Sequence, residues 1–224
     1  MTEQTEAKDE RRRPLSRERV LQAAVELADE RGLTALSMRK LADRLGVEAM
    51  SLYHHVSNKD DMLDGMIDLV VEEIELPKPG DEWRTAMRAR AVSAHDVFAR
   101  HEWAASLMES RTNPGHATLR YYDAVLGCLR RGGFPMALAA HAFSALDAYI
   151  YGFGMQEISL PFDGEEEVKE VAEALLEGFP VDLYPNLYEM IVDHALQPGY
   201  NYSDEFEFGL DLILDGFERL LVAE

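Results

Sequence analysis

The stretch MRKLADRLGVEAMSLYHHV, residues 38–56, constrains the fold more than any other part of the sequence. A short amphipathic segment ends at Gly46, which tolerates the positive φ of a tight turn, and a second short segment follows. Ala42 is small enough to let the two segments cross closely. Four apolar residues are spaced to hold the pair against a third helix: Leu41, Leu45, Val47 and Leu52. The pattern predicts a helix-turn-helix, whose second helix typically enters the major groove of DNA.

Capping residues predict the helices around this unit. Ser16 and Ser37 are the expected N-caps of the first two helices, and a third helix covers about 48–55. Ser57-Asn58-Lys59-Asp60 has the S-x-x-D pattern of a capping box with Ser57 as the N-cap, in front of an apolar helix at about 59–75. Further helices are expected at about 81–100, 102–109, 114–131, 134–157, 165–177, 182–196 and 203–222. No strand hairpin is evident, so the predicted fold class is all-α.

Charge is divided unevenly along the chain. The net charge is −20, but residues 11–59 hold ten Lys and Arg against six acids, a difference of +4. Residues 61–224 hold eleven basic residues against thirty-one acids, a difference of −20. An acidic body keeps a protein soluble and weakens its non-specific binding to polyanions, while a basic head can still dock on phosphates.

Cysteine usage and hydropathy indicate a cytoplasmic protein. Cys128 is the single cysteine, so an internal disulfide is impossible. The polar N-terminus lacks the apolar segment of a secretory signal, and no run approaches the length of a membrane-spanning helix. We therefore expect no membrane association, and we interpret residues 1–14 as a disordered arm.

The side chains that packing does not need lie on or near the outward face of residues 38–56. Ala49 and Met50 can meet thymine methyl groups, and Ser51 can bond a base or a phosphate. Tyr53 and His55 can reach phosphate oxygens. Two basic residues flank this set: Arg39, placed for a bidentate contact to guanine, and Lys59, at a helix start that favours phosphate. The adjacent His54 and His55 point in different directions and lack a third ligand nearby, so no metal site is predicted.

The segment LSMRKLADRLGVEAMSLYHHVSNKDDMLDGM resembles the DNA-binding domain of the tetracycline-repressor (TetR) family. It carries Arg39, the LA and LGV elements, LY, HV and Asn58-Lys59 at the family's spacing. The resemblance covers residues 16–70. It implies a three-helix DNA-binding domain at 15–60 and operator contacts from Ser37, Arg39, Ala49, Met50, Ser51, Tyr53, His55 and Lys59. Met38 departs from the pattern, because that position is often a phosphate-binding Thr or Ser.

The C-terminal region, 61–224, is similar to the ligand-binding and dimerising domain of the tetracycline-repressor subgroup over about half its length. The resemblance implies a homodimer that pairs through helices at about 134–157 and 203–222. The positions of the His and Glu that hold magnesium–tetracycline fall near Leu107 and at Gln156, so tetracycline is not implied as the ligand. The candidate ligand-binding residues are Phe98, Trp103, Leu107, Met108, Tyr122, Phe143, Asp147, Tyr151, Met155 and Gln156, although these residue types also fit an ordinary core.

We therefore predict a transcriptional regulator, most simply a repressor, in which a homodimer binds palindromic double-stranded operator DNA. An unknown small-molecule effector releases it, and the helix at about 59–75 connects the two domains. No paired carboxylates, nucleophile motif or phosphate loop indicates an enzyme, and no cofactor is predicted. Three alternatives stay open: a ligand-independent dimeric DNA-binding protein, a helical enzyme or carrier, and an activator.

Overall fold

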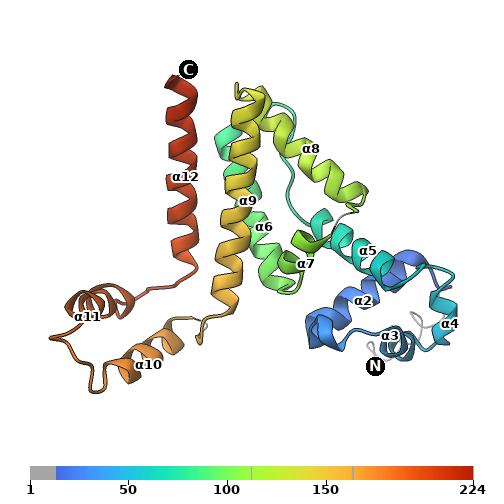
Figure 1. Ribbon diagram of the computed structural model, residues 1–224, viewed down its shortest axis with the longest axis horizontal. Coiled ribbons are helices and arrows are strands. Elements are labelled where there is room, and N and C mark those ends of the chain that lie inside the picture. Colours follow the sequence, from blue (N-terminus) through green and yellow to red (C-terminus); the bar gives the residue numbers. More distant parts are fainter. Residues whose placement is uncertain (1–13, 112, 163, 224) are drawn as a thin grey trace, which may run out of the picture. The chain divides into compact units, whose positions relative to one another are not determined.

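Helices form the regular structure of the chain in a computed structural model, which describes residues 14–111, 113–162 and 164–223 (Figure 1). No strand occurs in those ranges, and the all-α prediction is confirmed. The chain divides after Phe143 into two compact units. Apart from Pro14, the predicted disordered arm lies outside the described residues.

Within the described residues, the head of the first unit consists of α2 (Arg17–Arg31), α3 (Met38–Leu45) and α4 (Ala49–Leu52), with a 3₁₀ turn η1 (Leu33–Ala35) after α2. Both predicted N-caps are present. The Ser16 and Ser37 hydroxyls accept hydrogen bonds from backbone N–H groups three residues on, at 3.2 and 3.3 Å. Each cap satisfies a donor that a helix start would otherwise leave without a partner.

Gly46 ends α3 in the left-handed conformation, with φ 68° and ψ 36°. A side chain at this φ would be strained, so the glycine fixes where the chain turns from α3 to α4. Leu41, Ala42 and Leu52 are fully or almost fully buried, as the sequence predicted for the crossing of the two helices.

The N-cap of helix α5 (Lys59–Glu72) lies one residue later in the sequence than predicted. Asn58, not Ser57, is the N-cap, because its side-chain oxygen accepts a hydrogen bond from Asp61 N at 2.8 Å. Asp61 in turn accepts one from Ser57 N at 2.7 Å. The expected Ser57–Asp60 capping box is therefore wrong: both Ser and Asn can cap, and the Asp61 carboxylate selects Asn58.

Helix α5 packs against α2 on one side and α8 on the other. The first unit continues with α6 (Trp83–Arg100), α7 (Ala104–Ser110), α8 (His116–Arg131) and the start of α9 (Met136–Ile158). Met62, Met66 and Val70 of α5 are fully buried. The compact division after Phe143 thus keeps the head together with α5–α8, while the functional boundary near residue 60 stays a prediction.

The second unit contains the rest of α9, α10 (Glu165–Leu176), α11 (Pro185–Met190), a short π-helical turn η2 (Ile191–Ala195) and α12 (Asp204–Ala223). Tyr149 stacks on Phe206 with ring centroids 5.3 Å apart, and its hydroxyl donates to the Phe206 carbonyl at 3.0 Å. Gly209 makes room for this ring, since a Cβ there would lie 2.2 Å from the Tyr149 hydroxyl. In the described ranges, no helix is both long enough and apolar enough to cross a membrane.

Gly65 allows α5 to approach α2 closely, and this contact can be tested. A Cβ at Gly65 would lie 2.7–2.8 Å from the Leu21 methyl groups, and Leu21 is buried. We expect Gly65→Ala to lower the free energy of unfolding by about 1–3 kcal/mol through overpacking. Gly127→Ala in α8 is the control, because its Cβ would meet only the mobile end of Arg131, at 3.1 Å. Urea denaturation measures both, and equal stabilities would contradict the close-packing argument.

Candidate nucleic-acid interface

The predicted recognition helix is shorter than expected. Helix α4 covers Ala49–Leu52, and residues 53–55 continue it as a turn in which His55 N donates to the Leu52 carbonyl at 2.9 Å. The expectation of a helix over 48–55 is thus too long. Leu52 and Val56, both buried, anchor the two ends of this turn, and so they fix the residues between and before them relative to the head.

The predicted DNA-contacting residues differ in exposure. Met50 is 73% exposed and Tyr53 45%, which is high for large apolar and aromatic side chains on a folded surface. Arg39 and Lys59 are also exposed. The other four are half-buried: Ser37, Ala49, Ser51 and His55. Ser37 already accepts a hydrogen bond as the cap of α3, yet its hydroxyl proton can still be donated to a phosphate.

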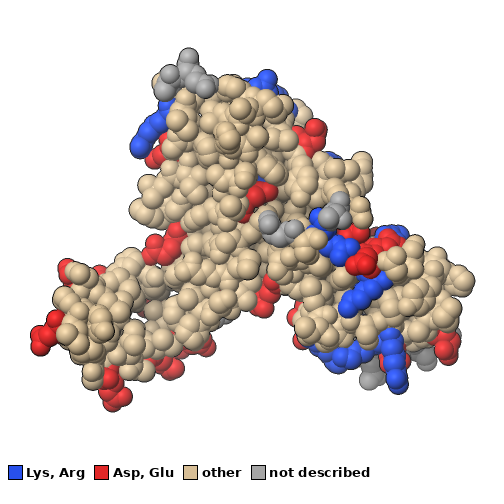
Figure 2. Space-filling model, viewed as in Figure 1, with Lys and Arg blue, Asp and Glu red and all other residues tan. Residues whose placement is uncertain are grey.

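Fewer basic side chains of the head are available to phosphates than the number of Lys and Arg in the sequence indicates. Arg44 is paired with Glu30 at 2.7 Å and with Glu26 at 3.0 Å, and the Glu30 hydrogen bond raises the pKa of the Arg44 guanidinium. Among the described residues, Arg39, Lys40 and Lys59 make no ion pair. Figure 2 shows Lys and Arg side chains along the lower edge of the head and further ones across its front. Those three charges are therefore available to phosphates.

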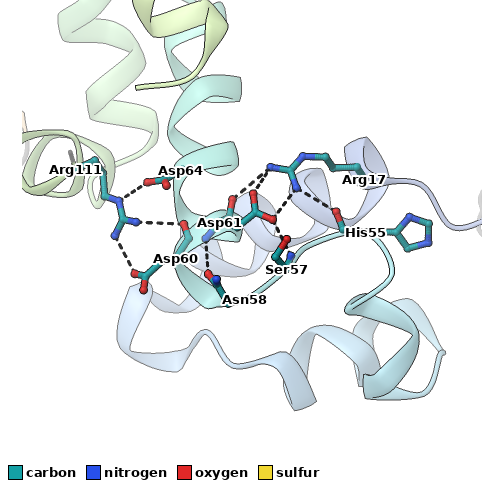
Figure 3. A network of polar contacts seen from close by, with 8 residues as sticks. All are labelled: Arg17, His55, Ser57, Asn58, Asp60, Asp61, Asp64 and Arg111. Carbon is teal, nitrogen blue, oxygen red and sulfur yellow. Dashed lines mark hydrogen bonds and ion pairs between the residues drawn. The ribbon is translucent and has the colours of Figure 1, made fainter. Parts of the chain in front are cut away.

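Arg17 braces the end of the recognition turn against α5 (Figure 3). Its guanidinium donates to the His55 carbonyl at 3.0 Å and to both carboxylate oxygens of Asp61, at 2.6 and 3.1 Å. Asp61 also accepts from Ser57 N. One charged pair thus joins α2, the chain after α4 and the first turn of α5.

This brace changes the acidity of Asp61. The hydrogen bond from Arg17, followed by that from the Ser57 backbone, lowers the pKa of the Asp61 carboxyl from its ordinary 3.8 to about 2. Asp61 is consequently ionised across the physiological range, and the Arg17 contact is a charge-assisted one.

Half of the candidate ligand-binding residues of the first unit belong to its core. Phe98, Trp103 and Met108 are buried, and Leu107, Tyr122 and Phe143 are half-buried. Tyr122 and Phe143 meet edge to face at 5.5 Å. Trp103 has a structural contact, because its indole N–H donates to Asp29 of α2 at 2.6 Å. Met108 and Tyr122 line one small cavity together with Asp64, Arg111 and Thr118.

The other four candidates lie in the second unit. Asp147 and Tyr151 are buried one helical turn apart, and the Tyr151 hydroxyl donates to Asp147 at 3.4 Å. Met155 and Gln156 are exposed. In the ranges that the structure describes, no three His, Cys, Asp or Glu side chains are grouped as metal ligands.

Two known family models together cover most of the chain. Residues 20–66 match the family described as bacterial regulatory proteins, tetR family, and residues 76–221 match the tetracyclin repressor-like C-terminal domain. The chain belongs to the tetR family. This membership confirms the resemblance that the sequence showed, and it makes the protein a DNA-binding transcriptional regulator and not an enzyme.

Relatives of this tetR-family protein include regulators from Saccharopolyspora, Streptomyces and Escherichia coli. An HTH-type transcriptional regulator of Saccharopolyspora erythraea is 41% identical over 147 residues, which are 65% of this chain and 62% of that protein, so the match spans less than two thirds of the relative. The repressor DrrR1 of Streptomyces coeruleorubidus is 33% identical over 94% of this chain and 79% of its own. The Streptomyces coelicolor protein ActR, solved in complex with actinorhodin, is 28% identical with a TM-score of 0.75, covering 93% and 99% of the two chains. Together these findings identify this protein as a transcriptional repressor of the tetR family.

Sequence reasoning missed the groups that brace the interface of this tetR-family head. Arg17 was counted only as part of a basic head, and Asp61 only as part of an apolar helix. Their partnership spans 44 positions in the sequence. No local periodicity signals it, although an Asp three residues after an Asn cap does mark a helix start.

The Arg17–Asp61 pair predicts a pH-dependent contribution to stability. The folded pKa of Asp61 lies below its ordinary value, so the contribution is present above pH of about 4 and is lost as pH falls towards about 2. We expect Asp61→Asn to lower the free energy of unfolding by about 1 kcal/mol at neutral pH, because both side chains are partly solvated. The difference from wild type should shrink as pH falls through this window.

Urea denaturation of both proteins as a function of pH measures the effect. Asp43→Asn is the control, since Asp43 is an exposed carboxylate of the same head that makes no ion pair with another described residue. A deficit for Asp61→Asn that is the same at every pH would show that the carboxylate charge is not what stabilises the head.

Proposed function

We propose that this tetR-family repressor binds a palindromic operator as a homodimer and that a small molecule releases it. The observation that carries the proposal is the head: a one-turn α4 with Met50 and Tyr53 exposed, flanked by Arg39 and Lys59, and braced from behind by Arg17. Such a surface fits the major groove, with apolar and hydroxyl groups towards base edges and basic groups towards phosphates.

The operator contacts that we propose are those predicted from the sequence: Ser37, Arg39, Ala49, Met50, Ser51, Tyr53, His55 and Lys59. Arg39 has a free fork of donors for guanine, and Lys59, at the start of α5, suits a phosphate near the helix dipole. The exposure of Met50 supports a contact with thymine methyls, because burial of that side chain on DNA would recover apolar area that the free protein leaves in water.

Dimerisation is proposed through α9 and α12. One face of α12 is already covered in the single chain, where Phe206, Leu210 and Leu214 are buried. Another face leaves Phe208 67% exposed and Leu212 58% exposed. Large apolar residues at i and i+4 of one helix make a stripe that a second copy can cover. A two-fold dimer would also supply the two heads that a palindrome requires.

Release by a small molecule is supported by the ActR complexes with actinorhodin and (S)-DNPA. For this chain we propose a hydrophobic or amphipathic effector, held by some of the candidate residues given above, with α5 transmitting its binding to the heads. Such an effector must bind the released state more tightly than the DNA-bound state, because equal affinity would shift neither population. A dimeric repressor without an effector is the second candidate, favoured by the thorough burial of Phe98, Trp103 and Met108.

Selection from a random duplex pool tests the operator-binding function. We expect the purified protein at near-physiological salt to recover a two-fold symmetric site. On that site Arg39→Ala should weaken binding by about 1–3 kcal/mol and relax the choice of base at one position of each half-site. Lys59→Ala is the comparison variant: it should weaken binding to all sequences alike and reduce the salt dependence by about one charge. Recovery of unrelated sequences only would refute the proposal.

The dimer has its own test. We expect Leu212→Glu to convert the protein to a monomer in light scattering, because a charge in an apolar interface is costly to desolvate. Leu119→Glu is matched in exposure, at 52%, but lies on α8, so it should stay dimeric. A dimeric Leu212→Glu protein would place the interface elsewhere.

A further inference from the structure

His101, the C-cap residue of α6, lies buried with both nitrogens of its ring against carboxylates. Nδ1 is 2.8 Å from Asp29 Oδ1, on α2, and Nε2 is 3.3 Å from Glu73 Oε1, on the C-cap residue of α5. The side chain of His101 is only 10% exposed. Three helices therefore meet at one imidazole ring: α2 through Asp29, α5 through Glu73 and α6 through His101 itself.

The two contacts determine which form of the ring fits between them. Asp29 Oδ1 also accepts a hydrogen bond from the indole N–H of Trp103, at 2.6 Å, so this oxygen is an acceptor and the facing Nδ1 must carry a proton. In the neutral ring, Nε2 would then turn its lone pair towards the Glu73 carboxylate, and the two would repel. In the charged ring, Nε2 carries a second proton and donates it to Glu73. The charged form is thus the one that satisfies both carboxylates.

The charges that face this ring are few. Glu73 Oε2 pairs with Arg100 at 2.7 Å, which leaves Oε1 to His101. Among the described residues, Asp29 pairs with no other basic side chain, and no further charged side chain pairs with His101. Trp103 adds a neutral donor. The site therefore holds two carboxylates and one permanent cation, and a charged His101 balances it.

This site lies at the other end of the α2–α5 pair from the Arg17 brace. Arg17 and Asp61 join the start of α2 to the start of α5. Asp29 and Glu73 lie near the ends of the same two helices, and His101 joins them. The first bridge uses an arginine, which is always charged, whereas the second uses a histidine, which changes its charge between about pH 5 and 8. One end of the α2–α5 contact is thus permanent, and the other is lost with a proton.

The relative position of α2 and α5 matters for DNA because the proposed contacts are divided between them. Helix α2 holds the reading surface, since it packs against α3 and its Arg17 donates to the carbonyl of His55 at the end of the recognition turn. Lys59, the proposed phosphate contact, is the first residue of α5. All of these groups can touch one operator only if the two helices keep a fixed arrangement.

We propose that His101 binds a proton to become a charged bridge between α2 and α5, and that operator binding is consequently linked to pH. The inference rests on the proposed function and adds a ligand, the proton, at a site separate from the residues proposed to touch DNA. Because DNA selects the bridged arrangement, binding is tightest at the acidic end of the range and weakens as rising pH removes the proton.

Operator binding at about pH 6 and about pH 8, at one ionic strength, tests the linkage. His116→Gln is the control, since His116 is an exposed histidine of the same unit that makes no ion pair with another described residue. We expect His101→Gln to bind the selected palindrome about fivefold or more weakly than wild type at the lower pH, and within about twofold of it at the higher pH. His116→Gln should follow wild type at both. His54 and His55 are present in all three proteins, so their own titration cancels from these ratios.

An equal loss at both pH values would show that the imidazole acts through its shape and not its charge, and it would overturn the linkage. So would equal affinities of His101→Gln and wild type at the lower pH. If the wild-type protein selects no palindrome, the proposed function fails and the pH linkage fails with it. The bridge itself is then still decided by the DNA-free protein.

Nitrogen chemical shifts of the His101 ring in the DNA-free protein provide that measurement. We expect both ring nitrogens to be protonated at about pH 6, and Nε2 to lose its proton as pH rises while Nδ1 keeps the one that it donates to Asp29. Glu73→Gln should make the ring lose the Nε2 proton at a lower pH, because the facing carboxylate is gone. A neutral ring at the lower pH, or a ring protonated only at Nε2 at the higher pH, would overturn the bridge.

Discussion

The first turn of α5 is the point on which the rest of the head depends, because its carboxylates are shared between two sets of helices. Asp61 holds Arg17, and through it α2 and the end of the recognition turn. Asp60 and Asp64, in the same turn or the next, hold Arg111 of α7. If α5 rotates relative to one of these two sets of helices, its contacts with the other set are strained. That coupling is what a regulator needs between a DNA-binding head and the helices behind it.

Features that arise from nearby residues could be predicted from the sequence. Ser16 and Ser37 cap their helices, and Gly46 turns the chain in the left-handed conformation, because each choice is decided within four residues. The burial of Leu41 and Leu52 follows from periodicity in the same way. The family pattern covers this same region, so fold class and general function could be predicted together.

Features that depend on distant partners could not be predicted. The choice between Ser57 and Asn58 as the cap is made by Asp61, whose carboxylate is itself oriented by Arg17. Helix α4 ends at Leu52, and the buried Leu52 and Val56 lie at the two ends of the turn that follows. Arg17 and Arg44 count as basic in the sequence, yet in the structure their charges are used inside the head. The candidate effector residues depend on a cavity, and residue type alone does not separate a cavity from a packed core.

The acidic residues also have a structural role that the composition alone does not show. From the sequence, the excess of acids indicated solubility and poor non-specific binding to DNA. Along α5, however, carboxylates serve as attachment points for arginines and for the start of α8. Asp60 and Asp61 directly follow Lys59, a proposed phosphate contact, so if they were unpaired they would repel the phosphate that Lys59 attracts. Pairing with Arg17 and Arg111 reduces that repulsion. The same ion pairs that hold the head in place therefore also make its surface acceptable to a polyanion.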